Sequence, residues 1–206
     1  MKTLKRCDER IYCRYVKRGL DIFFSFWLLA FLLLPMFVIA VIIRSNSDGN
    51  AIFKQKRRGR GGKTFTCYKF RTMYKYAPPT KSASELRERE KYITGVGRFL
   101  RRTSLDELPQ LFNVLKGEMS LVGPRPLICE EEEIHQKRME QGVYALRPGI
   151  TGMAQINGRN LLCDEEKLKK DSYYLQNIKI GLDAKILFCT FFKVAKGDGI
   201  DARTKE

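Results

Sequence analysis

The sequence predicts an α+β fold in which a small cytoplasmic domain is seated on the membrane by one apolar helix. Three observations support this. One apolar run of membrane length extends from Ile22 to Ile43. A strand–turn–strand pattern follows over residues 51–73, and amphipathic helical patterns occupy much of the remainder. We therefore expect a basic N-terminus with the membrane helix over residues 1–44 and a cytoplasmic domain over residues 45–206.

The composition points to an anionic partner. The 206 residues include 39 lysines and arginines against 23 acidic residues, a net charge of +16. Such an excess favours nucleic acid, an acidic membrane face or a phosphorylated substrate as the partner. Six cysteines are scattered without a C-x-x-C pair, and there is one histidine. A zinc site and a histidine-dependent catalytic triad are therefore poorly supported.

The apolar run has features of both a straight membrane span and a bent, re-entrant helix. As a straight helix it would measure about 33 Å, enough to cross a bilayer. Pro35 lies well inside it, where proline bends or breaks a helix. Lys17 and Arg18 precede the run and Arg44 follows it, so the positive-inside rule places both flanks on the cytoplasmic side. The residues alone leave both topologies open. The basic segment before the run is typical of one that binds anionic lipids.

Residues 51–73 predict a β-hairpin. One strand begins at Ile52, residues 58–63 form a glycine-rich turn, and the returning strand ends at Met73. The turn ends in the letters GKT, as a P-loop does. However, Arg57 stands where a P-loop requires its first glycine, and a strand follows where a helix is needed. A P-loop is therefore not supported.

Helical patterns occupy four later segments: residues 84–92, 130–141, 164–176 and 182–196. The first is highly charged and suits a solvated face. The second turns from acidic to basic, which complements the helix dipole, and His135 within it is interpreted as a surface residue. In the last, Asp183 is a plausible N-cap. Its apolar side chains and lysines are typical either of a helix at a membrane interface or of a core helix with basic ends.

The most informative stretch runs from Arg101 to Pro126. Ser104 and Glu107 have the spacing of a capping box, in which each side chain bonds to the backbone of the other. Pro109 conflicts with a regular helix capped at Ser104, because its ring and its missing N–H disfavour that position. The helix is then either kinked at Pro109 or begins near it.

A chemical interpretation of the same stretch stands beside this structural one. Adjacent carboxylates at a helix start, Asp106 and Glu107, would stay ionised, as a nucleophile must. Arg101 and Arg125 provide cations that could neutralise a diphosphate. Carboxylates also suit Mg²⁺, a hard cation that often bridges to substrate phosphates. Together these groups predict a phosphoryl-transfer site.

The chain resembles the bacterial sugar transferase family, the monotopic phosphoglycosyl transferases that begin the assembly of surface glycans. The resemblance rests on short motifs that occur in the family's order over almost the whole chain. They are Lys17-Arg18 with Asp21, the apolar run with Pro35, Phe53-Lys54-Gln55, Tyr68 to Met73, Thr103 to Leu111, Pro124-Arg125-Pro126 and Arg147 to Gly152. Each motif is weak alone, whereas the ordered set is specific. One departure is Leu34, because the family commonly places serine before this proline.

The resemblance implies an activity, a mechanism and a location. The activity is transfer of a sugar 1-phosphate from a UDP-sugar to a polyprenol phosphate (undecaprenyl phosphate) with release of UMP. The location is the cytoplasmic face of the bacterial inner membrane, reached by a re-entrant helix. Asp106 would form a covalent aspartyl-phosphosugar, with Glu107 as a second catalytic residue and both carboxylates as ligands of Mg²⁺. The substrate contacts implied by the resemblance, or by charge as above, are Lys69, Arg71, Arg101, Arg125 and Arg147.

Two other classes of protein fit parts of the sequence. A membrane-anchored basic nucleic-acid-binding protein would use the positive charge, but no nucleic-acid-binding motif is evident. A non-catalytic membrane scaffold would use the helices and leave Asp106, Glu107 and the arginines without a role. Salt-sensitive DNA binding would favour the first class, and Mg²⁺-dependent UMP release would favour the enzyme. We expect no nucleic-acid partner.

Overall fold

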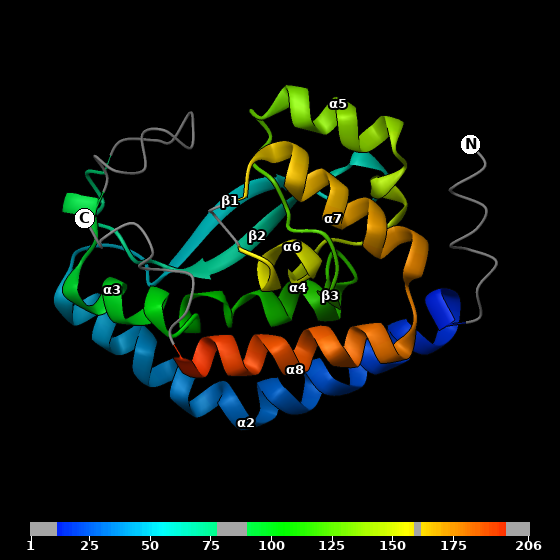
Figure 1. The fold of residues 1–206 in the computed structure, drawn as a ribbon. Helices are drawn as coiled ribbons and strands as arrows, with labels where there is room; N and C mark the ends of the chain where they lie inside the picture. The colour runs from blue at the N-terminus through cyan, green and yellow to red at the C-terminus, as the bar shows by residue number, and fades with distance from the viewer. Residues whose placement is uncertain (1–11, 78–89, 159–161, 197–206) are drawn as a thin grey trace.

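A long helix, α2 (Lys17–Asn46), forms the base of the molecule as drawn in Figure 1. The computed structural model describes residues 12–77, 90–158 and 162–196. The predicted apolar helix is confirmed, and it extends past the predicted run at both ends and continues through Pro35 as one α-helix. Within the described ranges it is the one helix long and apolar enough to cross a membrane, and 17% of its most apolar window is buried. Most of its apolar surface is therefore left uncovered by protein.

One stripe of α2 packs against the rest of the domain. Leu29, Met36 and Ile43 are buried, and their seven-residue spacing places them on one face because seven residues make nearly two helical turns. They share a core cluster with Phe70 and Leu100. The helix thus lies along the domain instead of projecting from it.

Polar contacts hold α2 to the domain at both ends. At its start, Lys17 forms an ion pair with Asp183 at 2.6 Å, and Arg18 donates to the carbonyl of Val114 at 2.7 Å. At its end, Arg71 donates to the carbonyl of Ser47 at 2.6 Å. Both termini of this helix are consequently attached to the same folded unit.

Two small sheets form the β-structure of the domain. Strands β1 (Ile52–Arg58) and β2 (Thr64–Phe70) are antiparallel, with Ile52 opposite Phe70, which confirms the predicted hairpin. Its turn contains a short 3₁₀ segment, η2 (Arg60–Gly62), in which Gly61 adopts a left-handed conformation with φ of 67°. Strands β3 (Ser120–Val122) and β4 (Gly149–Thr151) form a parallel pair that the sequence did not predict.

Helices account for most of the remaining described chain. They are η1 (Tyr12–Val16, a π-helix), η4 (Glu90–Tyr92), α3 (Gly95–Arg102), η5 (Leu105–Glu107), α4 (Gln110–Lys116), α5 (Glu132–Glu140), η6 (Val143–Ala145), α6 (Met153–Ile156), α7 (Asp164–Asn177) and α8 (Ile180–Lys196). The helices predicted over residues 130–141, 164–176 and 182–196 are confirmed as α5, α7 and α8. The helix predicted over residues 84–92 lies mostly outside the described residues, and its end forms η4.

Two predictions about single residues in these helices are wrong. His135 is buried and not on the surface, because its ring bonds to the hydroxyl of Tyr144 and, at 2.8 Å, to the carbonyl of Ile128. Asp183 does not cap α8, which begins three residues earlier, at Ile180. Its carboxylate instead turns inward to meet donors from distant parts of the chain. In α8 the side chains of Phe188 and Phe191 are exposed, as expected of a helix at a membrane interface.

Candidate active site

The two predicted catalytic carboxylates lie in a short 3₁₀ turn, η5, between α3 and α4. Ser104, just before this turn, has φ of 57°, the one positive φ among the described residues other than glycine. Its side chain makes no capping bond, so the predicted capping box is wrong. Helix α4 begins at Gln110 directly after Pro109, and this confirms the alternative in which the helix starts near the proline. Because Pro109 cannot continue a helix from Ser104, Asp106 and Glu107 are carried on a turn of their own.

Glu107 is held by two of the predicted substrate-binding residues. Lys69, from β2, contacts its carboxylate at 2.7 Å, and Arg125 approaches the same oxygen at 3.5 Å. The side chains of Lys69 and Glu107 are 20% and 16% exposed. The contact is therefore partly screened from water, and the structure gathers three of the predicted residues into one cluster, which we name the Glu107 cluster: Lys69, Glu107 and Arg125.

Asp106 stands beside this cluster with its carboxylate unengaged. No side chain or backbone group in the described part of the chain forms a hydrogen bond with it. Burial raises the pKa of Asp106, and the adjacent charge of Glu107 raises it further. Lys69, Arg101 and Arg125 act on it in the opposite direction. The carboxylate is thus surrounded by cations and keeps its lone pairs available, as a nucleophile or a metal ligand requires.

Arg101 is placed near Asp106 by a contact that the sequence does not signal. Its Nε donates to the hydroxyl of Thr72 at 2.8 Å. Thr72 lies just beyond β2, so this bond ties the end of α3 to the hairpin that carries Lys69. The predicted set of Lys69, Arg101, Asp106, Glu107 and Arg125 is therefore brought together in one region.

The structure does not bring Arg71 and Arg147 into this region. Strand β2 ends at Phe70, and the Arg71 side chain turns to the carbonyls just past the end of α2. Arg147 donates from its Nε to the carbonyl of Gly117 at 2.9 Å, at the far end of α4. The prediction that these two arginines contact substrate stays a prediction.

Two arginines that sequence reasoning missed, the half-buried Arg57 and the buried Arg138, fix the loop that carries Arg125. Arg57 donates to the carbonyl of Pro126 at 3.0 Å, and Arg138 donates to the carbonyl of Arg125 itself at 2.8 Å. Arg138 is in turn paired with Asp171 at 2.5 Å, with both side chains almost fully buried. Burial lowers the pKa of Arg57, and the nearby Arg125 lowers it further. No periodic pattern in the sequence marks either arginine.

The carboxylates at this site fit the magnesium ion that the sequence predicted. No group of three histidine, cysteine, aspartate or glutamate side chains suited to a metal occurs among the residues that the structure describes. Asp106 and Glu107 offer two sets of oxygen donors, and Mg²⁺ commonly takes one or two carboxylates with substrate phosphates and water. The repulsion that raises the pKa of Asp106 would be relieved by a divalent cation.

Comparison with known proteins gives one family and several named relatives. The model of the family described as "Bacterial sugar transferase" matches residues 12–197. The uncharacterized sugar transferase EpsL of Bacillus subtilis is 45% identical over 165 residues, covering 80% of this chain and 79% of the relative.

Two longer relatives carry specific names. The undecaprenyl-phosphate galactose phosphotransferase of Salmonella typhimurium is 39% identical over 200 residues, 90% of this chain and 42% of its own length. The UDP-glucose:undecaprenyl-phosphate glucose-1-phosphate transferase of Escherichia coli is 38% identical over 187 residues, 87% of this chain and 40% of its own length. The chain thus spans about two fifths of these two relatives.

Proposed function

The chain belongs to the bacterial sugar transferase family, and from that membership we propose that it is a phosphoglycosyl transferase. It transfers a sugar 1-phosphate from a UDP-sugar to a polyprenol phosphate, undecaprenyl phosphate, and releases UMP. The names of the Salmonella and Escherichia relatives support both substrates. In this role the enzyme performs the first membrane step of surface-glycan assembly.

One observation carries the proposal beyond family membership. Asp106, an aspartate without a hydrogen-bond partner in the described chain, lies among Lys69, Arg101 and Arg125. A buried carboxylate normally has donors, because leaving it without them is costly. Three cations surround this carboxylate, and none of them forms a hydrogen bond with it. This arrangement indicates a binding site for an anionic ligand, and a diphosphate is an anion of the required charge.

We propose that the reaction proceeds in two displacements at the same phosphorus. An oxygen of Asp106 attacks the phosphorus that bears the sugar, the bond from that phosphorus to the UMP oxygen breaks, and UMP leaves with the electron pair. The sugar phosphate is then esterified to Asp106. An oxygen of the polyprenol phosphate attacks the same phosphorus, the bond to Asp106 breaks, and the carboxylate is regenerated. Dividing the transfer in this way lets one small site accept two large anions in turn.

The residues of the Glu107 cluster have separate roles in this proposal. Arg125 binds phosphate oxygens through its planar guanidinium group, which its two flanking prolines and two further arginines hold in place. Lys69 neutralises Glu107 at 2.7 Å and so limits the repulsion that Glu107 exerts on Asp106. Arg101 adds positive charge from α3. When bound, Mg²⁺ would be held by Asp106 and Glu107 and would neutralise charge on the phosphates.

We further propose that α2 is a re-entrant helix and that both of its ends face the cytoplasm. The attachment of both ends to one domain supports this topology: the start through Lys17 and Arg18, the end through Arg71. A straight crossing would place the two ends on opposite sides of the bilayer, and these contacts would then have to break. Residues 1–44 form the membrane unit and residues 45–206 the catalytic unit in this arrangement.

A screen of UDP-sugars for UMP release tests the activity. The full chain in detergent micelles is incubated with each UDP-sugar, undecaprenyl phosphate and Mg²⁺, and UMP is quantified. We expect UMP release with at least one UDP-sugar, loss of it in Asp106→Asn, and loss of it on chelation of Mg²⁺. Failure of every UDP-sugar to yield UMP with a well-folded protein would contradict the proposal.

A further inference from the structure

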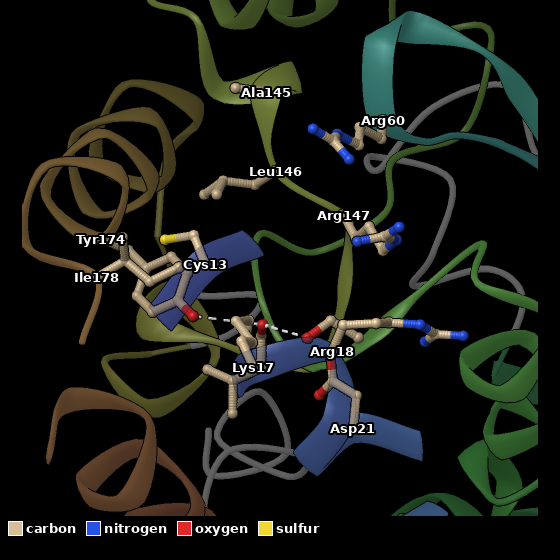
Figure 2. A pocket seen from close by; sticks show the side chains of 12 residues that line it. Cys13, Lys17, Arg18, Asp21, Arg60, Ala145, Leu146, Arg147, Tyr174 and Ile178 are labelled. Atoms are coloured by element: carbon tan, nitrogen blue, oxygen red, sulfur yellow. Dashed lines mark hydrogen bonds between the residues drawn. The ribbon is translucent and has the colours of Figure 1, made fainter. Parts of the chain in front are cut away.

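A cavity of about 120 Å³ is lined by Arg18 and Arg147 (Figure 2), whose side chains bond to carbonyls at the C-terminal end of α4. It is lined from the start of α2, from the hairpin turn η2 and from the segment that precedes β4. The seven residues of α4 separate it from the turn that carries Glu107, a distance of roughly 10 Å along the helix axis. The cavity is thus separate from the candidate active site.

Three arginines from three different elements line this cavity: Arg18, Arg60 and Arg147. Arg18 is anchored through both terminal nitrogens, which donate to the carbonyls of Val114 at 2.7 Å and Leu115 at 3.1 Å. Arg147 is anchored through Nε alone. No described residue accepts a hydrogen bond from its two terminal nitrogens, so the fork of this guanidinium group is oriented but unused.

Positive charge exceeds negative charge around the cavity. Lys17 also lines it but is neutralised by Asp183 at 2.6 Å. Asp21 is a lining carboxylate, and one of its oxygens already accepts a backbone N–H at 3.0 Å. Three arginines and one aspartate therefore line the cavity besides Lys17. Burial, Arg60 and Arg18 lower the pKa of Arg147 by more than Asp21 raises it.

We propose that this cavity binds a phosphate group, as a monoester or diester, with Arg147 as its principal ligand and Arg60 and Arg18 completing the charge. The unused fork of Arg147 matches a pair of phosphate oxygens, and Arg60 and Arg18 add positive charge beside it. The site is distinct from the Glu107 cluster, and its existence does not depend on the proposed function.

A lipid head group is the source of phosphate that the position favours. Arg18 is the second residue of α2, and the following turns expose Ile22, Phe23 and Phe26. If those side chains enter the acyl region, the arginine lies at the level of the head groups, where basic residues bind lipid phosphates. This assignment of the source rests on the membrane association in the proposed function. Phosphate binding itself does not.

Binding measurements on the full chain in detergent micelles test the site. Thermal unfolding and equilibrium titration are followed with three probes: dihexanoyl phosphatidate, inorganic phosphate, and dihexanoylglycerol as the phosphate-free counterpart. We expect saturable stabilisation by phosphatidate and none by dihexanoylglycerol. Arg60→Gln should weaken phosphatidate binding about tenfold, because it removes one charge-assisted hydrogen bond to the phosphate. Lys63→Gln is the matched control, because it removes one exposed charge from the same turn.

A second variant protects the test from folding effects. Arg147→Lys keeps the charge, and it should also weaken binding because lysine lacks the fork.

Binding of phosphatidate alone, or of both phosphatidate and inorganic phosphate, supports the site with a lipid source. Binding of inorganic phosphate alone supports the site and overturns the lipid assignment. If neither phosphatidate nor inorganic phosphate binds, the proposal is overturned. It is also overturned if Arg60→Gln and Arg147→Lys bind normally while Arg125→Lys loses binding, because the phosphate would then occupy the Glu107 cluster.

Discussion

Two aspartates, the half-buried Asp106 and the buried Asp183, have opposite surroundings in this fold. Asp183 accepts hydrogen bonds from Tyr12 at 2.7 Å, Lys17 at 2.6 Å and Tyr174 at 2.6 Å. Asp106 accepts none from any residue in the described ranges. A carboxylate with a full set of donors fastens the elements that supply them, whereas a carboxylate without donors retains its capacity to bind a ligand.

The pKa shifts around the two aspartates express the same difference. Burial and the Asp183 carboxylate raise the pKa of Tyr12 and of Tyr174, so both phenols stay protonated as donors. At Asp106 it is the carboxylate itself whose pKa rises, because of burial and Glu107. The pKa therefore rises at the aspartate that the proposed reaction uses.

Replacing Asp106 should cause the largest loss of activity. Asp106→Asn keeps the shape and removes the nucleophile, so we expect turnover to fall by about 10³-fold or more. Intact-protein mass spectrometry should detect a phosphosugar adduct on the wild type after incubation with UDP-sugar and none on this variant. Near-normal turnover, or a wild type that never carries the adduct, would remove Asp106 from the nucleophile's role.

Replacing Asp183 should instead destabilise the fold. Asp183→Asn leaves Lys17 as a buried charge without its partner, and we expect a loss of about 3–5 kcal/mol in the free energy of unfolding. Denaturant titration in detergent micelles measures it. Glu132→Gln is the control, since it removes one partner of an exposed ion pair with Arg58 at 3.3 Å and should cost less than about 1 kcal/mol. Equal effects of the two variants would contradict the structural role of Asp183.

Changing Arg125 should have an intermediate effect on catalysis. Arg125→Lys retains the charge and loses the planar fork, so we expect kcat/KM to fall by about 10- to 100-fold. Steady-state kinetics measures the loss. Arg98→Lys, an exposed arginine on α3, serves as the matched substitution. Unchanged kinetics in Arg125→Lys would mean that the proline-flanked arginine only shapes the loop.

The raised pKa of Asp106 predicts a pH dependence of stability with a definite sign. A folded-state pKa above the unfolded value makes the ionised form costly in the fold, so the penalty is absent at low pH and grows as pH rises through the folded pKa. Asp106→Asn should therefore be more stable than the wild type at neutral pH. Thermal unfolding across pH should show this advantage shrinking on acidification. An advantage that is constant with pH would contradict the raised pKa.

The smallest expected effect concerns Pro35 and the proposed re-entrant topology of α2. Single cysteines at Tyr15 and Ser45, in a chain cleared of its native thiols, should both resist a membrane-impermeant reagent added outside spheroplasts. Pro35→Ala should expose the Tyr15 position in a minor fraction of molecules, because a continuous apolar helix permits a crossing. Adding Asp183→Asn should enlarge that fraction, since Lys17 is then released. Outside labelling of the Tyr15 position in the otherwise unchanged protein would establish a simple span instead.

Much of the fold was predictable because it depends on local pattern. The apolar run, the hairpin and the helices α5 and α7 follow from periodicity and charge within short windows. Charge and motif order likewise selected Asp106, Glu107 and Arg125 as members of one site. These features need no knowledge of which distant segments meet.

The missed features depend on contacts between distant segments. Arg138 and Asp171 are 33 residues apart and pair only because α5 and α7 pack together. Arg71 lies one residue past the end of β2, where alternation no longer determines its direction. Ser104 has a left-handed backbone conformation, which residues other than glycine rarely adopt. A pattern in a short window cannot reveal any of these.

The contact between Lys17 and Asp183 also orders events during synthesis. The two residues are 166 positions apart, so at translation rates of roughly 5–20 residues per second the lysine waits about 10–30 s for its partner to be made. For that interval the apolar helix has left the ribosome while the carboxylate that secures its start does not yet exist. In the proposed membrane-associated enzyme, insertion of α2 into the bilayer therefore precedes closure of the domain, which α8 completes.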